Sequence, residues 1–180
     1  MTYPSGGASA VPLGRAAHLP VGGGVVLAGI GNEMRHDDGA GPVVVARAAQ
    51  LAPGHAGGLF AALETSLSEP LDLLGYWDGA DVAIVVDAVR SGAVPGTVTL
   101  TWFEEGAVTL RRAGRRRPST HGLGVADVYC LAHELGLAPR RVALVGVEGQ
   151  DFSHGEGLSE PVDCGADRAA TLVLELARAL

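Results

Sequence analysis

The fold of this chain is decided by Gly29–Gly41, which reads Gly-Ile-Gly-Asn-Glu-Met-Arg-His-Asp-Asp-Gly-Ala-Gly. Apolar runs flank it, Val25–Ala28 before and Val43–Ala46 after. This order predicts a strand, a glycine turn, an acidic loop and a helix. Loops at the carboxyl ends of strands are where ligands bind in open α/β sheets. Two adjacent aspartates, Asp37 and Asp38, repel each other unless water, a metal or helix N–H groups relieve them, so this loop is a candidate site.

Alternation of strand and helix patterns continues along the chain and predicts an α/β fold. We expect strands at 25–30, 59–63, 81–87, 97–103 and 142–147, and helices at 38–51, 70–77, 122–135 and 162–180. The apolar interiors of the third and fifth of these strands are typical of a sheet covered on both faces. The expected architecture is a three-layer sandwich, with a twisted, mostly parallel sheet flanked by helices.

Length and composition restrict the domain organisation and the function classes. The 180 residues suit one domain, which we place at residues 25–180. Residues 1–24 are rich in Gly, Ala, Pro and Ser and are expected to form a flexible extension. A net charge of −7 argues against nucleic-acid binding. No apolar run reaches the ~18 residues of a membrane span.

Two cysteines, Cys130 and Cys164, have no zinc-site spacing. We expect Cys130 to act as a small apolar residue in a helix, and Cys164 to be exposed in a turn. Free thiols fit a reducing compartment, so a cytoplasmic location is expected. An arginine-rich segment, Arg111–Arg117, is most simply a solvated loop, with a partner-docking patch as the alternative.

Common catalytic and nucleotide-binding motifs are absent from the sequence. The third glycine of a dinucleotide fingerprint would fall at position 34, which is Met34. No Gly-Lys-Ser/Thr follows the first strand, and neither HExxH nor a Gly-x-Ser-x-Gly elbow occurs. Asp37 or Asp38 could serve as a helix N-cap. Asp87 ends an apolar strand and is a site candidate, with a turn cap as its structural alternative.

The motifs acquire more meaning as an ordered set. Gly29-Ile30-Gly31-Asn32 is followed by Asp37-Asp38-Gly39, by Asp87-Ala88, by Ser119-Thr120-His121 and by Gly146-Val147-Glu148-Gly149. From about Val25 to Val162 this order closely resembles the hydrogenase maturation endopeptidases. The resemblance implies a twisted α/β peptidase domain. It also implies removal of a C-terminal extension from the large-subunit precursor of [NiFe] hydrogenase after nickel insertion.

By position, the residues that contact metal in the family correspond to Asp38, Asp87 and His121, which the resemblance also implies are catalytic. Two carboxylates and an imidazole suit Ni²⁺, although affinity alone would not exclude Zn²⁺ or Cu²⁺. The resemblance implies that nickel arrives on the substrate and is not held tightly at rest. Either the metal, or a carboxylate of Asp38 or Asp87 as general base, could activate water. Asp37 is expected to cap the helix or to support the cluster.

Two other functions stay open at this stage. The chain could bind nickel or the loaded precursor without cutting it, because no nucleophile motif is recognisable. It could also be a small-molecule hydrolase, because one α/β scaffold supports many reactions.

Overall fold

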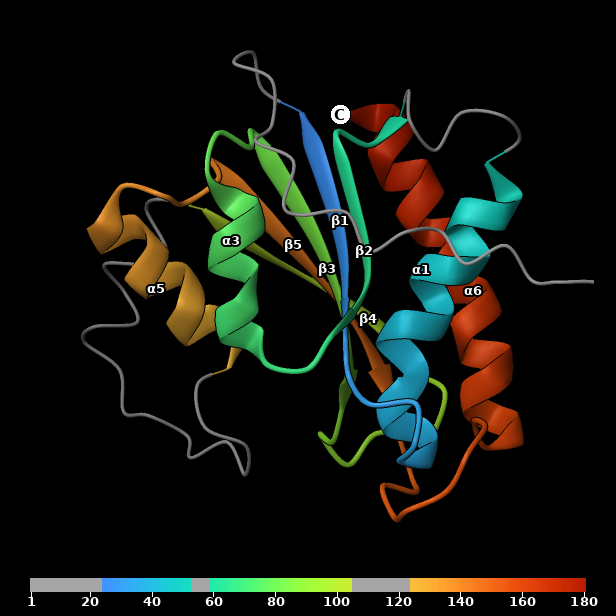
Figure 1. The fold of residues 1–180 in the computed structure, drawn as a ribbon. Helices are drawn as coiled ribbons and strands as arrows, with labels where there is room; N and C mark the ends of the chain where they lie inside the picture. Colours follow the sequence, from blue (N-terminus) through green and yellow to red (C-terminus); the bar gives the residue numbers. More distant parts are fainter. Residues whose placement is uncertain (1–23, 53–58, 105–123) are drawn as a thin grey trace, which may run out of the picture.

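A five-stranded sheet in the order β2-β1-β3-β5-β4 forms the centre of the computed structural model, which describes residues 24–52, 59–104 and 124–180 (Figure 1). Strands β2, β1, β3 and β5 run parallel, and β4 pairs with β5 in the antiparallel sense. The strands are β1 (Val25–Ile30), β2 (Ala62–Leu67), β3 (Val82–Val89), β4 (Val98–Glu104) and β5 (Arg141–Glu148). The predicted α/β fold with a mostly parallel sheet is therefore confirmed.

Helices cover both faces of the sheet. Figure 1 shows α1 and α6 side by side on one face, and α3 and α5 on the other. The helical segments are η1 (His36–Gly39), α1 (Ala40–Leu51), η2 (Pro70–Leu73), α3 (Leu74–Trp77), α5 (Val125–Leu135) and α6 (Glu160–Ala179). No helix within the described ranges is both long and apolar enough to cross a membrane.

The period-2 alternation of each strand divides the core into two layers. In β3, Ile84 and Val86 join the buried cluster beneath α1 and α6. Ala83 and Val85 join the cluster beneath α3 and α5, in which Trp77 and Tyr129 meet edge-on with ring centroids 6.2 Å apart. Since both faces of β3 are buried, its continuous apolar sequence is explained.

The clearest differences from the sequence-based expectations concern β2, α5 and Cys164. The second strand covers Ala62–Leu67 and not 59–63, because an edge strand tolerates the exposed polar residues Thr65 and Ser66, which carry no apolar signal. Helix α5 begins at Val125, later than the expected residue 122. Cys164 is exposed as predicted, but it lies inside α6 and not in a turn. Several predictions fall outside the described residues: the extension at 1–24, apart from Gly24, together with His121 and the segment Arg111–Arg117.

The order of the strands creates a topological switch point between β1 and β3. From β1 the chain passes through α1 to β2 on one side, and then crosses to β3 on the other side. In open α/β sheets the crevice at the carboxyl ends of two such strands is the usual place for ligands. The segment after β1 carries Asp38 and the C-terminal half of β3 carries Asp87, so the fold brings both to the carboxyl edge at this crevice.

Candidate active site

Asp38 and Asp87 reach the switch point from two different strands. Asp38 lies on η1, the single helical turn that follows β1 and packs against β3. Asp87 is the sixth residue of β3, and its neighbour in the sheet is Gly146 of β5. By alternation from Ala83 and Val85, Asp87 belongs to the face that α3 and α5 cover. We call Asp38 and Asp87 the acidic pair.

The environment of Asp87 favours its protonated form. Burial disfavours the charged carboxylate, and the negative charge of Asp38 adds to the effect. A hydrogen bond with the backbone of Ala88 opposes both, yet the pKa of Asp87 rises to about 7. A carboxyl group with a pKa near neutrality, paired with a second carboxylate, is typical of a functional site and costs stability in the charged state.

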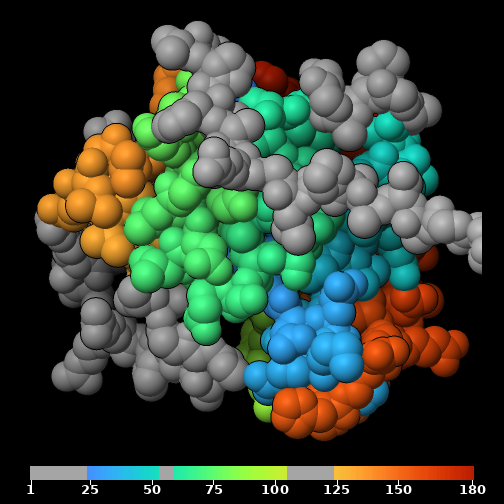
Figure 2. All heavy atoms as spheres, in the orientation of Figure 1, coloured from blue at the N-terminus to red at the C-terminus, as the bar shows by residue number. Residues whose placement is uncertain are grey.

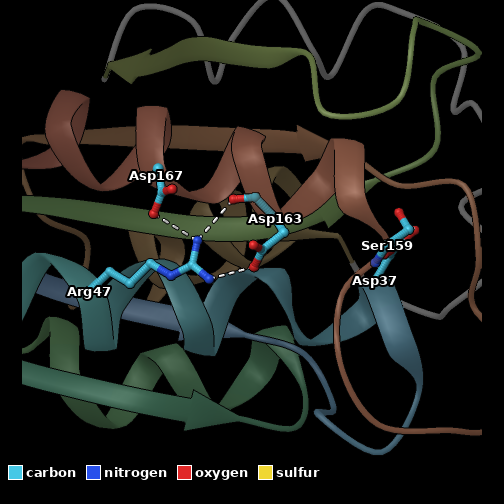
Figure 3. A network of polar contacts seen from close by, with 5 residues as sticks. All are labelled: Asp37, Arg47, Ser159, Asp163 and Asp167. Atoms are coloured by element: carbon cyan, nitrogen blue, oxygen red, sulfur yellow. Dashed lines mark hydrogen bonds and ion pairs between the residues drawn. The ribbon is translucent and has the colours of Figure 1, made fainter.

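Asp37, the neighbour of Asp38, is completely buried and plays another role. Its carboxylate accepts hydrogen bonds from the backbone N–H of Gln150, Asp151 and Ser159 at 2.9, 2.9 and 2.7 Å. The hydroxyl of Ser159 donates a further one at 3.0 Å, and Figure 3 shows the two side chains together. Burial raises the pKa of Asp37, but these donors outweigh it, and the pKa lies below its usual value.

The hydrogen bonds of Asp37 correct one expectation from the sequence. Helix α1 begins at Ala40 with Gly39 at its N-cap, and no side chain caps it, so neither Asp37 nor Asp38 is the helix cap. Asp37 instead fixes the loop 149–159 that joins β5 to α6. Figure 2 shows this loop, in orange, against the residues that follow β1, in blue. The prediction that Asp37 supports the site is consistent with this contact.

A second buried carboxylate, Glu148, does for the loop after β3 what Asp37 does for the loop after β5. Glu148 ends β5 and is 2% exposed. It accepts hydrogen bonds from the N–H and hydroxyl of Ser91 and from the N–H of Gly92, all between 2.7 and 3.0 Å. Burial raises the pKa of Glu148, and these donors lower it below its usual value. We call Asp37 and Glu148 the carboxylate anchors.

Sequence reasoning included Glu148 in a motif but gave it no role. The available signal was an acidic residue that directly follows the apolar run Val142–Val147, the same signal that identified Asp87. What separates the two residues is the set of donors that each finds, and those donors come from a distant part of the chain.

Glycines allow the loop after β1 to pack closely on its neighbours. Gly31 has a φ of +138°, and a Cβ there would lie 1.8 Å from the carbonyl oxygen of Asp38. A Cβ on Gly29 would lie 2.6 Å from the carbonyl oxygen of Gly41 at the start of α1. Only glycine fits these positions, and the turn is further fixed by Asn32, whose side chain accepts the N–H of Met34.

The acidic pair by itself offers a metal ion only carboxylate oxygens as ligands. Within residues 24–52, 59–104 and 124–180, no group of three His, Cys, Asp or Glu side chains could hold a metal ion. The third predicted ligand, His121, lies in the part of the chain that the structure does not describe. It precedes α5, and α5 covers the face of the sheet to which Asp87 belongs.

Comparison with known proteins gives the family of the chain. Residues 68–176 match the model of the family "HycI: Hydrogenase maturation protease". The hydrogenase expression/formation protein HoxM of Azotobacter vinelandii is 36% identical over 104 residues, 57% of this chain and 49% of that protein. The protein HupD of Rhodobacter capsulatus is 30% identical over 141 residues, 78% of this chain and 64% of that protein.

Among solved structures, the hydrogenase maturating endopeptidase HybD from E. coli is similar with a TM-score of 0.66 and 26% identity. The match covers 86% of this chain and 92% of HybD. The matched regions span about half to two thirds of the two curated relatives above. The family model matches more than half of the chain, and the fold agrees with that of HybD. The chain therefore belongs to the hydrogenase maturation protease family.

Proposed function

We propose that this protein is an endopeptidase that removes the C-terminal extension of a [NiFe] hydrogenase large-subunit precursor after nickel insertion. The observation that carries the proposal is the acidic pair at the switch point of a chain in the maturation protease family. The names of similar proteins support the reaction class, since HybD is a hydrogenase maturating endopeptidase.

The acidic pair suits a substrate that brings its own divalent cation. Asp38 raises the pKa of Asp87, so the two carboxylates are poorly accommodated as a doubly charged pair. A cation that contacts both carboxylates would relieve their repulsion and displace the proton that Asp87 retains near pH 7. Asp38, Asp87 and His121 are the proposed contacts to the nickel of the precursor. Nickel is then a feature of the substrate that the enzyme recognises.

The acidic pair can also supply the general acid or base that peptide hydrolysis requires. A carboxyl group with a pKa of about 7 exchanges its proton readily at neutral pH, which a general acid or base requires. Asp87 therefore fits that role better than the anchors, whose pKa values are lowered. We place the reaction in the cytoplasm, since the free thiols Cys130 and Cys164 fit a reducing compartment.

The test is cleavage of the purified precursor, followed by the mass of the released C-terminal peptide. Wild-type protein is mixed with precursor that is loaded with nickel or free of it, and cleavage is expected only with the loaded form. Asp38→Asn, Asp87→Asn and His121→Ala are expected to lose cleavage. Asp81→Asn is the matched control, because Asp81 is exposed at the opposite end of β3 and should leave cleavage unchanged.

Three results would contradict the proposal. If wild-type protein binds the loaded precursor tightly and releases no peptide, the chain is a binding module and not a protease. If His121→Ala cleaves as fast as wild type, the proposed metal contacts are wrong. Equal cleavage of nickel-loaded and nickel-free precursor would remove nickel from the recognition step.

A further inference from the structure

An arginine at the carboxyl edge of the sheet lies over an aromatic ring. Arg90 follows β3 directly, and its guanidinium carbon is 4.4 Å from the centre of the Phe152 ring. Arg90 is exposed, and Phe152 is half-buried. Two residues, Ala88 and Val89, separate Arg90 from Asp87, so the Cα atoms of Asp87 and Arg90 are at most ~10 Å apart. Arg90 and the acidic pair therefore share the carboxyl edge of the sheet.

Phe152 is held firmly as a platform for this arginine. It lies in loop 149–159, which the Asp37 carboxylate fixes at both ends through the N–H groups of Gln150, Asp151 and Ser159. Arg35 donates to the carbonyl oxygen of Phe152 at 3.2 Å. A Cβ on Gly149 would lie 2.5 Å from the ring, so glycine there lets the ring lie against the backbone.

The surroundings of Arg90 differ from those of the other described arginine on an aromatic ring. Arg141 lies 5.0 Å from the centre of the Trp102 ring at the opposite end of the sheet, and Glu104 is within 4.0 Å of its guanidinium. Among the described residues, no carboxylate forms an ion pair with Arg90. Although the net charge of the chain is −7, the described part of it thus offers Arg90 no carboxylate partner.

We infer that Arg90, stacked on Phe152, binds a carboxylate on the part of the substrate that flanks the scissile bond. The inference rests on the proposed function and names a specificity determinant for it. A guanidinium stacked on a ring presents its edge, and two parallel N–H groups match the two oxygens of a carboxylate. Asp87 and Arg90 are three residues apart on β3 and the loop after it, so the carboxylate would lie within about three residues of the cut.

The carboxylate could belong to an Asp or Glu side chain or to the end of a peptide chain. Both sources offer the same two oxygens to the guanidinium. Two altered substrates distinguish them. In one precursor, the Asp and Glu residues within about three positions of the cleavage site are changed to Asn and Gln. The other precursor is semisynthetic and ends in an amide.

The experiment measures KM and kcat for the nickel-loaded precursor, together with the Kd of the same precursor. Arg90→Gln is expected to raise KM and Kd about tenfold while kcat changes little, since the lost contact is a charge-assisted hydrogen bond. Phe152→Leu keeps the apolar bulk and removes the ring, so a smaller rise in KM is expected. Arg141→Ala is the matched control and should leave both constants unchanged.

The effects of the altered precursors are then compared with the effect of Arg90→Gln. With one of the altered precursors, the KM of wild-type protein should rise about tenfold. With that same precursor, Arg90→Gln and wild-type protein should have the same KM, because the contact is already lost. The inference is overturned if Arg90→Gln behaves like Arg141→Ala, or if neither altered precursor is discriminated by wild-type protein. Because wild-type cleavage is measured in the same assay, failure of this inference is distinguishable from failure of the proposed function.

Discussion

Asp37 and Asp38 are neighbours in the chain, yet the structure gives their carboxylates opposite surroundings. The anchors, Asp37 and Glu148, are buried and receive several N–H and O–H donors each, and their pKa values fall. The acidic pair lies at the same edge of the sheet, and the pKa of Asp87 rises to about 7. The hydrogen bonds of the anchors stabilise loops, whereas burial and the charge of Asp38 make ionisation of Asp87 unfavourable. Donor supply, and not burial alone, separates the two groups.

The largest expected effect on stability comes from removing an anchor. Asp37→Ala leaves the N–H groups of Gln150, Asp151 and Ser159 without their acceptor in a buried site. We expect the free energy of unfolding to fall by about 3 kcal/mol, as measured by urea denaturation. Asp37→Asn keeps one acceptor oxygen and should lose less. A loss below ~0.5 kcal/mol for Asp37→Ala would show that the comparison overstates the anchors.

Removing a member of the acidic pair should have the opposite sign. Folding raises the pKa of Asp87 from 3.8 to about 7, so the folded state loses stability as pH rises between these values. Asp87→Asn abolishes this cost and should raise the free energy of unfolding at pH 8 by roughly 1–3 kcal/mol. The gain should disappear near pH 4. If Asp87→Asn is less stable than wild type at pH 8, the contrast between the anchors and the acidic pair is wrong, whatever the effect on cleavage.

The pH dependence of stability offers a third test. The lowered pKa of Asp37 means that its contribution is fully present above its unfolded value of 3.8 and is lost as pH falls through the folded value. The difference in unfolding free energy between wild type and Asp37→Asn should therefore be constant from pH 8 to about 5 and shrink in more acidic solution. Urea denaturation at each pH measures it. A constant difference down to the acid limit would contradict the assigned hydrogen bonds.

The smallest effect is expected at an exposed polar contact between α1 and α6. Arg47 on α1 pairs with Asp163 and Asp167 on α6, as Figure 3 shows. The side chains of the two aspartates are 52% and 72% exposed, so solvent screens the pairs. Arg47→Met should lower the free energy of unfolding by ~0.5 kcal/mol and leave cleavage unchanged. A loss as large as that of Asp37→Ala would mean that ion pairs on the surface matter as much as buried anchors.

Local sequence patterns predicted most of the strands and singled out Asp87, but they did not predict the partners of the carboxylate anchors. Apolar runs gave β1, β3 and β5 because a strand buried on both faces must be apolar throughout. Asp87 was found because a carboxylate that follows such a run stands out. The edge strand β2 was misplaced because its exposed polar residues leave no comparable pattern.

Long-range partners could not be predicted. The donors that make Asp37 an anchor lie 113 to 122 residues further along the chain, and those of Glu148 lie 56 or 57 residues before it. Nothing local distinguishes a carboxylate that will meet such donors from one that will meet another carboxylate. The stacking of Arg90 on Phe152 joins two loops in the same way and escaped notice for the same reason.

The long reach of Asp37 also has a consequence for the order of events when the chain is made. Synthesis proceeds from the N-terminus, so the loop after β1 emerges before its partners, the furthest of which, Ser159, lies 122 residues beyond Asp37. All five strands precede Ser159 in the sequence, and the sheet can therefore assemble before Asp37 has a complete set of donors. The carboxyl edge then becomes rigid only after Ser159 has been made, so the candidate site is completed later than the sheet that carries it.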